Sequence, residues 1–313
     1  MITGTLSRYF GWRFLSAVLA VFAGTLVLTA MIDFLEMLRR SADVKDVSAL
    51  LVAQITLSRV PFITERVMPF AVLVGAMFCY LNLSRRLELV VARASGISAW
   101  QFMAPALAIA ALLGIALTTV YNPISANLRE FSTRLEADLS RPDSGFRGTG
   151  RGFWLRQRSE DGQAVINAKS SAPSDRESFL LKTSLTPVQV GESFATPETV
   201  PFWQLSSYID HAENAGLAAA GYRLQYYQLL AQPFYLAAMV LLAASVSLRF
   251  FRFGGVQKIV LGGIGAGFAL YILSKVTGDL SKAGLMGPLA AAGLPPAIGA
   301  ITGLMALLYQ EDG

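Results

Sequence analysis

The sequence predicts a membrane α-helical protein with six transmembrane helices and a polar, β-rich domain inserted between the third and the fourth. Six long apolar runs lie three on each side of one polar stretch of roughly 100 residues. In addition, 54% of the residues are hydrophobic and only 15% are charged, whereas soluble domains carry about 25% charged residues. A bilayer core of about 30 Å requires about 20 apolar residues per helical span. Since no water satisfies backbone polar groups there, each run is predicted to be helical.

The apolar runs fix the expected boundaries of the spans and domains. The predicted spans are Phe14–Phe34, Ile63–Leu83, Phe102–Tyr121, Leu229–Phe250, Ile259–Val276 and Leu285–Tyr309. We assign residues 1–121 to helices one to three, 122–222 to the inserted domain and 223–313 to helices four to six. The first run is too long for a signal peptide and lacks a clear cleavage site, which favours a retained helix. Glycines in the fifth run, at positions 262, 263, 265 and 267, predict close helix packing.

Basic residues in the short loops predict the orientation. Lys and Arg favour the cytoplasmic side of a membrane, and they gather before the first run and in the second and fourth loops, at Arg8, Arg13, Arg85, Arg86, Arg93, Arg249, Arg252 and Lys258. Alternating spans place all three groups on one side. Both termini are therefore predicted to be cytoplasmic and the large insert periplasmic, in a multi-pass protein of the bacterial inner membrane.

The composition argues against an enzyme or a nucleic-acid-binding protein. The chain has one cysteine, Cys79, and one histidine, His211, so an internal disulfide is impossible and a metal site or Ser-His-Asp triad is not expected. No P-loop pattern is present. The net charge of +5 is explained by loop charges that orient the helices. We expect no catalytic site, no metal and no cofactor in this chain.

The insert is predicted to begin with a polar helix and to continue as short strands. Residues 127–139 have helical character and extend the third span outward. Strand candidates follow at residues 152–155, 164–167 and 178–181, and a helical stretch is expected at Phe202–Ala215. So few strands bury a poor independent core.

The loop between the second and third spans carries the most specific signal. Ser84 is expected to cap a short helix and Gly96 to end it. An apolar face is predicted from Leu87, Val90, Val91 and Ala94, with the charged residues off it. Such a helix fits either a membrane surface or the docking of a cytoplasmic motor subunit, and the pattern alone leaves both open.

The run from Leu87 to Ser98 resembles the cytoplasmic coupling segment of the lipopolysaccharide export permease family LptF/LptG, also called YjgP/YjgQ. Further pieces agree in order, namely Arg8-Tyr9, Met68-Pro69-Phe70, Leu73-Val74-Gly75-Ala76, Gly152-Phe153-Trp154-Leu155, Lys182–Pro187, Tyr208, Tyr222, Gln232-Pro233, Gly267-Phe268, Tyr271 and Leu273. The resemblance covers nearly the whole chain. Leu89-Val90-Val91 followed by Ala94-Ser95-Gly96 is more similar to the LptG branch than to LptF.

The resemblance implies a transport permease that works in outer-membrane biogenesis without a catalytic site of its own. Its expected partners are a second, LptF-like permease, an LptB-like ATPase dimer that binds ATP and Mg²⁺, LptC- and LptA-like bridge components, the membrane and lipopolysaccharide. The coupling segment, residues 84–98, implies ATPase contacts by Glu88, Arg85, Arg86, Arg93 and Gly96. The inserted domain is expected to be a β-jellyroll, although the chain is shorter there by about 50 to 60 residues than a full eight-stranded one.

The resemblance also implies a lipid path, from which this chain departs at two points. Arg39 and Arg40 match a basic pair expected to meet the anionic head group, because guanidinium groups bind phosphate bidentately. Asp33 replaces a basic residue that the family often has nearby, and Gln228 to Leu230 lack the family's basic residue before Pro233. Candidates for the acyl-chain surface are Phe22, Leu26, Ile32, Phe34, Phe62, Phe70, Phe78, Phe268, Ile272 and Leu273. Helix packing or lipid-facing surface is the alternative for each of them.

Two other classes of function remain as alternatives to the permease. A membrane-embedded lipid enzyme would need a Ser, Asp or His constellation at membrane depth, and the spans contain serines but no histidine. A scaffold or channel subunit of another membrane complex would need no such group. Co-purification with a soluble ATPase of the P-loop type distinguishes the permease from both.

Overall fold

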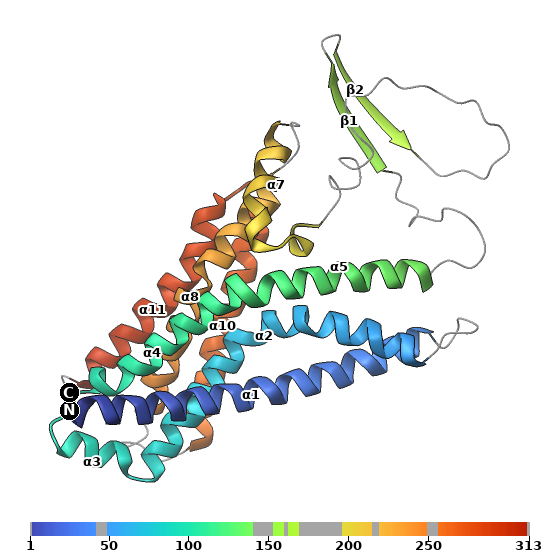
Figure 1. Ribbon diagram of the computed structural model, residues 1–313. Helices are drawn as coiled ribbons and strands as arrows, with labels where there is room; N and C mark the ends of the chain where they lie inside the picture. Colours follow the sequence, from blue (N-terminus) through green and yellow to red (C-terminus); the bar gives the residue numbers. More distant parts are fainter. Residues whose placement is uncertain are drawn as a thin grey trace. The chain divides into compact units, whose positions relative to one another are not determined.

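The computed structural model describes residues 2–41, 49–139, 153–159, 162–168, 196–214, 219–248 and 256–311. The chain divides into two compact units. One comprises Met1–Ser132 with Ala195–Gly313, and the other comprises Thr133–Phe194. The first unit is a bundle of long helices (Figure 1).

The described residues include six helical segments that are long and apolar enough to cross a membrane. They are α1 (Ile2–Ser41), α2 (Ala49–Arg85), α4 (Ala99–Ala116) with its continuation α5 (Asn122–Leu139), α8 (Ala220–Leu248), α10 (Val256–Lys282) and α11 (Pro288–Glu311). The prediction of six long apolar helices is confirmed. The sixth begins later than predicted because Gly284 adopts a left-handed φ of 76° and the chain turns before Pro288.

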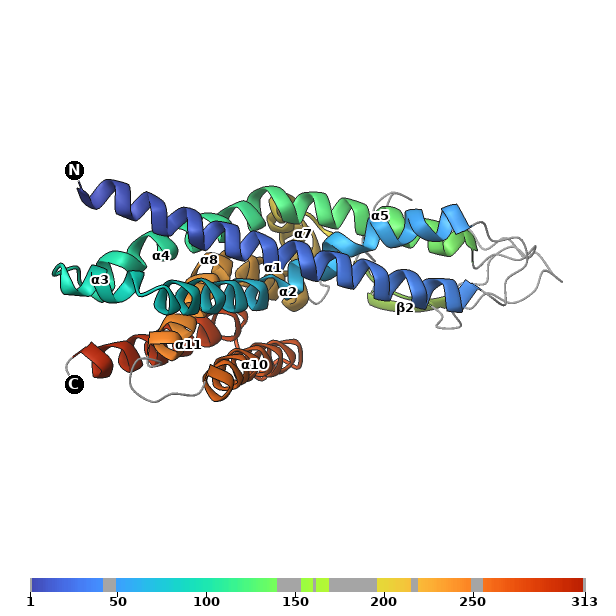
Figure 2. The ribbon, with the colours of Figure 1, turned by 90° about the horizontal axis from the view of Figure 1, so that it is seen from below.

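The first two helices extend well beyond the predicted spans. With 40 residues, α1 is about 60 Å long, which is twice the thickness of a bilayer core. Helix α2 runs beside it in both views (Figures 1 and 2). Asp33 of α1 is buried and forms an ion pair of 3.8 Å with Arg59 of α2. Asp33, which the sequence marks as a departure from a basic rim, therefore joins the two helices.

Small residues allow the helices to approach closely, as the glycines of the fifth run predict. A Cβ atom on Gly267 would lie 2.5 Å from Leu73, and one on Gly263 would lie 2.6 Å from Met77. Both neighbours belong to α2, so these two glycines form the contact between α10 and α2. Gly262 and Gly265 face open space, which shows that only one stripe of the glycine run serves this contact.

The third span changes its helical pitch where it meets the proline of α8. Between α4 and α5, Leu117–Tyr121 form a single π-helical turn. The Thr118 hydroxyl donates to the Leu229 carbonyl of α8 at 2.8 Å. Pro233, four residues after Leu229, has no N–H to donate to that carbonyl. The π-turn thus supplies a donor for an acceptor that the proline leaves unpaired within its own helix.

Thr118→Val is expected to destabilise the protein by about 1 to 2 kcal/mol, because the Leu229 carbonyl would lose this donor in an apolar interior. Thermal unfolding in a mild detergent measures the change. Thr119→Val is the matched control, since the Thr119 hydroxyl bonds only to Ile115 of its own helix. Equal stabilities of the two variants would contradict this assignment.

The inserted region shows the first predicted strands and the predicted helix. Strands β1 (Phe153–Ser159) and β2 (Gly162–Ala168) pair antiparallel, with Phe153 opposite Ala168. After the short 3₁₀ turn η2 (Pro197–Thr199), helix α7 covers Phe202–Asn214. These described residues contain a two-stranded hairpin and leave the jellyroll unconfirmed. The strand expected at 178–181 lies outside the described residues.

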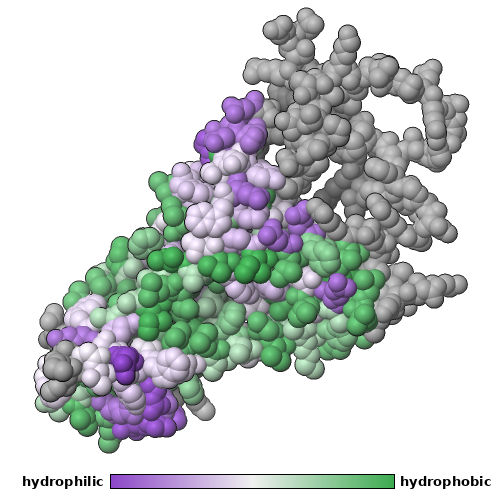
Figure 3. All heavy atoms as spheres, viewed as in Figure 1, coloured by the Kyte–Doolittle hydropathy of each residue, from purple (hydrophilic) through white to green (hydrophobic). Residues whose placement is uncertain are grey.

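One end of the bundle brings together the start of α1, the end of α11 and the short helix α3 (Glu88–Ala94) (Figures 1 and 2). In Figure 3, apolar residues cover the long sides of the helices, and hydrophilic residues gather at this end and around α7. Helix α3 therefore lies at the same end of the bundle as the two termini of the chain.

Candidate functional site

Helix α3 begins three residues later than a Ser84 cap requires. Helix α2 continues through Arg85, so Ser84 lies buried in its last turn, and its carbonyl accepts from the Leu87 amide at 3.0 Å. Leu87 turns the chain with a left-handed φ of 61° and precedes the first residue of α3. The predicted Ser84 cap is therefore wrong. The predicted end is confirmed, since Gly96 has a φ of 86° just after α3.

Two apolar faces flank the axis of α3. Leu89 and Ala92 are buried and belong to the same core cluster as Phe10 and Phe102. The side chains that the sequence assigned to one face point away from this core, with Leu87, Val90 and Val91 exposed by 59%, 41% and 67%. The pattern predicted the outer face and missed the inner one. One face fixes α3 to the bundle, and the other is left uncovered.

The basic residues of the coupling segment surround the uncovered face. Arg85 and Arg86 precede α3, Arg93 lies in its last turn, and all three side chains are exposed. Gly96, also exposed, provides the turn into α4. The capping box of Ser98 and Gln101 then starts α4. This surface is apolar at its centre and cationic at its margin.

Glu88 is held by the first helix. The Tyr9 hydroxyl donates to Glu88 Oε2 at 3.1 Å, and Arg13 Nη2 lies 3.9 Å from Glu88 Oε1. Arg13 also donates to the Tyr9 hydroxyl oxygen from Nε at 3.1 Å and from Nη2 at 2.8 Å. Sequence reasoning singled out Tyr9 and Glu88 separately and did not bring them together, because they lie 79 positions apart.

A second charged cluster lies far along α2 from α3. Phe62 forms a platform for two arginines, with Arg129 Cζ 3.5 Å and Arg66 Cζ 4.5 Å from the centre of its ring. Both guanidinium groups reach Glu198 of η2, Arg66 at 2.6 Å and Arg129 at 3.3 Å. Sequence reasoning assigned Phe62 to an acyl-chain surface and did not identify either arginine.

A buried polar network positions this cluster. Glu65 of α2 accepts hydrogen bonds from Asn122 at 2.8 Å and from Ser125 of α5. The Asn122 side chain also accepts from the Phe202 amide of α7 at 3.0 Å. The hydrogen bonds of Glu65 and Asn122 thus connect α2, α5 and α7. Glu65 is the sequence neighbour of Arg66, and Ser125 lies one helical turn before Arg129. The buried carboxyl group of Glu65 links α2 to α5, and Asn122 extends the network to α7.

The predicted lipid-contacting residues separate into two groups. Arg39 is exposed in the last turns of α1, and the Arg40 side chain lies outside the described residues. Ile32, Phe78, Phe268 and Ile272 are exposed by 45% to 61%. Leu26, Phe34 and Leu273 are partly buried, as are Phe22, which packs against Tyr121, and Phe70, which packs against Tyr271 at 5.4 Å.

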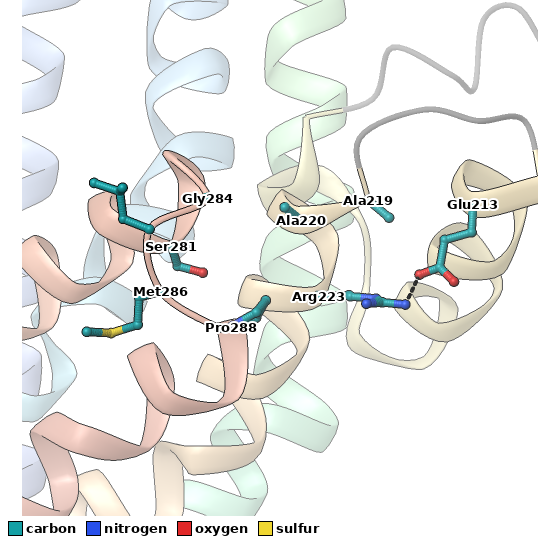
Figure 4. A pocket seen from close by; sticks show the side chains of 10 residues that line it. Glu213, Ala219, Ala220, Arg223, Ser281, Gly284, Met286 and Pro288 are labelled. Carbon is teal, nitrogen blue, oxygen red and sulfur yellow. Dashed lines mark ion pairs between the residues drawn. The ribbon is translucent and has the colours of Figure 1, made fainter.

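A cavity of about 460 Å³ opens where α7 and α8 meet the turn between α10 and α11 (Figure 4). Glu213 and Arg223 form an ion pair across its mouth, and Ser281, Met286 and Pro288 line it. His211 is exposed on α7. Among the residues that the structure describes, no group of three His, Cys, Asp or Glu side chains lies close enough to hold a metal ion.

The chain is similar in sequence to a family of known proteins. Residues 8–178 and 156–309 match the family described as "Lipopolysaccharide export system permease LptF/LptG". The lipopolysaccharide export system permease protein LptG of Escherichia coli K12 is 23% identical over 353 residues, covering 95% of this chain and 94% of the relative. LptG of Haemophilus influenzae is 24% identical, covering 88% of this chain and 90% of the relative. The E. coli alignment is longer than this 313-residue chain, so it includes positions for which the chain has no residue.

Proposed function

This chain belongs to the lipopolysaccharide export permease family LptF/LptG, and from that premise we propose that it is one permease subunit of an ABC transporter. The transporter extracts lipopolysaccharide from the inner membrane and passes it to a periplasmic bridge. The chain resembles LptG, and an LptF-like permease is its partner. A separate ATPase dimer binds ATP and Mg²⁺ and supplies the energy.

The uncovered face of α3 carries the proposal. Val91 is the most exposed apolar side chain of this helix, and Leu87, which precedes the helix, is exposed as well. An apolar patch rimmed by polar side chains is the usual anatomy of a protein–protein interface. Leu89 on the inner face packs α3 against the core of the bundle. A force that the ATPase applies to α3 would therefore be transmitted to the transmembrane helices.

Arg66 lies midway along α2 and Arg85 lies in its last turn, and the helix between them is long enough to cross a membrane. Arg66 and Arg85 are separated by nineteen residues, about 28 Å of helix, which is close to the thickness of a bilayer core. The end that carries α3 and its arginines is cytoplasmic by the distribution of basic residues. Arg66 then lies at the periplasmic interface.

The exposed apolar faces of α1 and α10 form this subunit's share of the lipid cavity. Only 6% of the apolar window of α1 and 22% of that of α10 are buried in this chain. A second permease that covers both helices would enclose a space for acyl chains. The exposed residues Ile32, Phe268 and Ile272 are the acyl-contacting candidates that this arrangement favours.

The arginine cluster at the opposite end is suited to the anionic head group. Arg66 is about half exposed and its guanidinium can reach a phosphate without leaving the Phe62 ring. Glu198 now accepts from both arginines. A phosphate at the same place would compete with that carboxylate, so we propose that the head group binds here. Arg39 and Arg40, farther along α1, remain separate predicted contacts.

Arg66→Ala is expected to lower the lipopolysaccharide that co-purifies with the transporter by about fivefold, since it removes one charge-assisted phosphate contact. Quantitative mass spectrometry of bound lipid per permease measures the loss. Arg223→Ala is the matched control because this arginine has a similar exposure and its own ion pair with Glu213. A similar loss in both variants would contradict a specific head-group site.

Purification in a mild detergent tests the function itself. Proteins and lipids that accompany the chain from membranes are identified by mass spectrometry. We expect a second permease, a P-loop ATPase and lipopolysaccharide. Recovery of the chain without any ATPase, or chemical alteration of a lipid by the isolated chain, would refute the proposal.

A further inference from the structure

The Glu88 carboxylate faces α1, although it lies on the segment that docks the ATPase. Both of its oxygens have partners there, the Tyr9 hydroxyl on Oε2 and the Arg13 guanidinium near Oε1. The outer face of α3 is formed by Leu87, Val90 and Val91. The most exposed contact surface and this carboxylate are therefore separate parts of the same short helix.

The hydrogen bonds fix the direction in which the Tyr9 hydroxyl donates. Arg13 donates to the Tyr9 oxygen from two nitrogens, Nε and Nη2. A phenol has one proton to donate, and an oxygen that already accepts from two donors directs that proton elsewhere. Glu88 Oε2 is the acceptor within reach, at 3.1 Å. Arg13, one helical turn from Tyr9, thereby supports the carboxylate both directly and through the phenol.

We propose that Glu88 is a joint between α3 and α1, with Tyr9 and Arg13 as its positioning residues. The proposal rests on the transport function above and assigns a route within it. When the ATPase displaces α3, the joint pulls the cytoplasmic end of α1 with it. Since α1 is the least buried of the six spans, this movement acts directly on the wall of the lipid cavity.

The alternative role for Glu88, a direct contact with the ATPase, makes a different prediction for pairs of mutations. If Glu88 acts through Tyr9, removing either group breaks the same link, and the double variant is no worse than either single one. If Glu88 binds the ATPase, its loss weakens docking whereas loss of the Tyr9 hydroxyl does not, and the two effects add.

The test compares Tyr9→Phe, Glu88→Ala and the double variant in the complete transporter reconstituted in vesicles. Tyr9→Phe keeps the aromatic ring against Phe10 and removes the hydroxyl alone. We expect lipopolysaccharide released per ATP hydrolysed to fall about fivefold in all three variants, because each of them removes the same charge-assisted hydrogen bond. Recovery of the ATPase with Tyr9→Phe should stay within about twofold of wild type. Additive losses, or loss of the ATPase in Glu88→Ala alone, would overturn the proposal.

Exchanging the charges at positions 88 and 13 tests whether Glu88 acts through its contact with α1 or is needed for another reason. Glu88→Arg places two cations opposite each other, and Arg13→Glu in the same chain restores an opposite pair. We expect the exchange to recover at least half of the coupling lost in Glu88→Arg. A contact with the ATPase would not be restored by a change in α1, so failure of the exchange would count against the joint.

Spin labels on the two helices test the joint without the ATPase. In a Cys79→Ala background, which removes the chain's one cysteine, labels at positions 12 and 94 lie on exposed residues of α1 and α3. We expect the distribution of distances between the two labels to be narrower in the protein that has Tyr9 than in the Tyr9→Phe variant. An unchanged distribution would refute the joint even where transport is intact, and absence of the ATPase from wild type would refute the proposed function instead.

Discussion

Val91→Asp is expected to reduce recovery of the companion ATPase at least 30-fold while the permease still inserts in the membrane. Val91 is 67% exposed in this chain, and docking would bury it at the centre of an apolar contact. An unpaired carboxylate in such a place costs about 2 kcal/mol or more, the range of interface hot spots. Affinity purification of the permease, followed by quantification of the ATPase, measures the loss.

Leu285→Asp is the control for this substitution. Leu285 is 77% exposed and lies in the turn between α10 and α11, at the opposite end of the helices from α3. It receives the same charge at a similarly open apolar position. The ATPase should remain bound to this variant. If Val91→Asp retained the ATPase, the outer face of α3 would not be the docking surface.

The six spans could be predicted because a long apolar run has one physical solution in a bilayer. The limits of the helices could not, since α1 and α2 continue as helices into polar sequence and support each other there through Asp33 and Arg59. The strands β1 and β2 could be predicted because both runs contain β-branched or aromatic residues, whereas their pairing as a hairpin was not predicted. The end of α3 was predictable because Gly96 tolerates a positive φ.

The inner face of α3 and the charged clusters were harder to predict. A helix of seven residues makes about two turns, so Leu89 and Val90 are equally plausible as inward-facing residues until a partner helix is placed. The contacts of Glu88 with Tyr9, and of Arg129 with Phe62, join segments far apart in the chain. Local periodicity contains no information on which arginine meets which ring.

Gly114→Ala is expected to destabilise the permease by about 3 kcal/mol, the upper end of overpacking effects in well-packed interiors. A Cβ atom on Gly114 would lie 2.4 Å from the Pro233 Cα and 2.8 Å from its nitrogen. Backbone atoms on both sides cannot rotate away, so α4 and α8 must separate. That separation would also lengthen the bond from Thr118 to the Leu229 carbonyl. Thermal unfolding in detergent measures the loss.

Gly265→Ala provides the comparison, since this glycine also lies within a span and nothing approaches its Cβ position within 4 Å. Alanine has a better helix propensity than glycine, so stability should be unchanged or slightly higher. The Gly114 variant should unfold at a clearly lower temperature. Because Gly114 packs against Pro233 and Thr118 bonds to Leu229 one helical turn away, combining Gly114→Ala with Thr118→Val should cost less than the two changes separately. Full additivity would mean that the close approach and the hydrogen bond form independently, and that the π-turn does not depend on the glycine beside it.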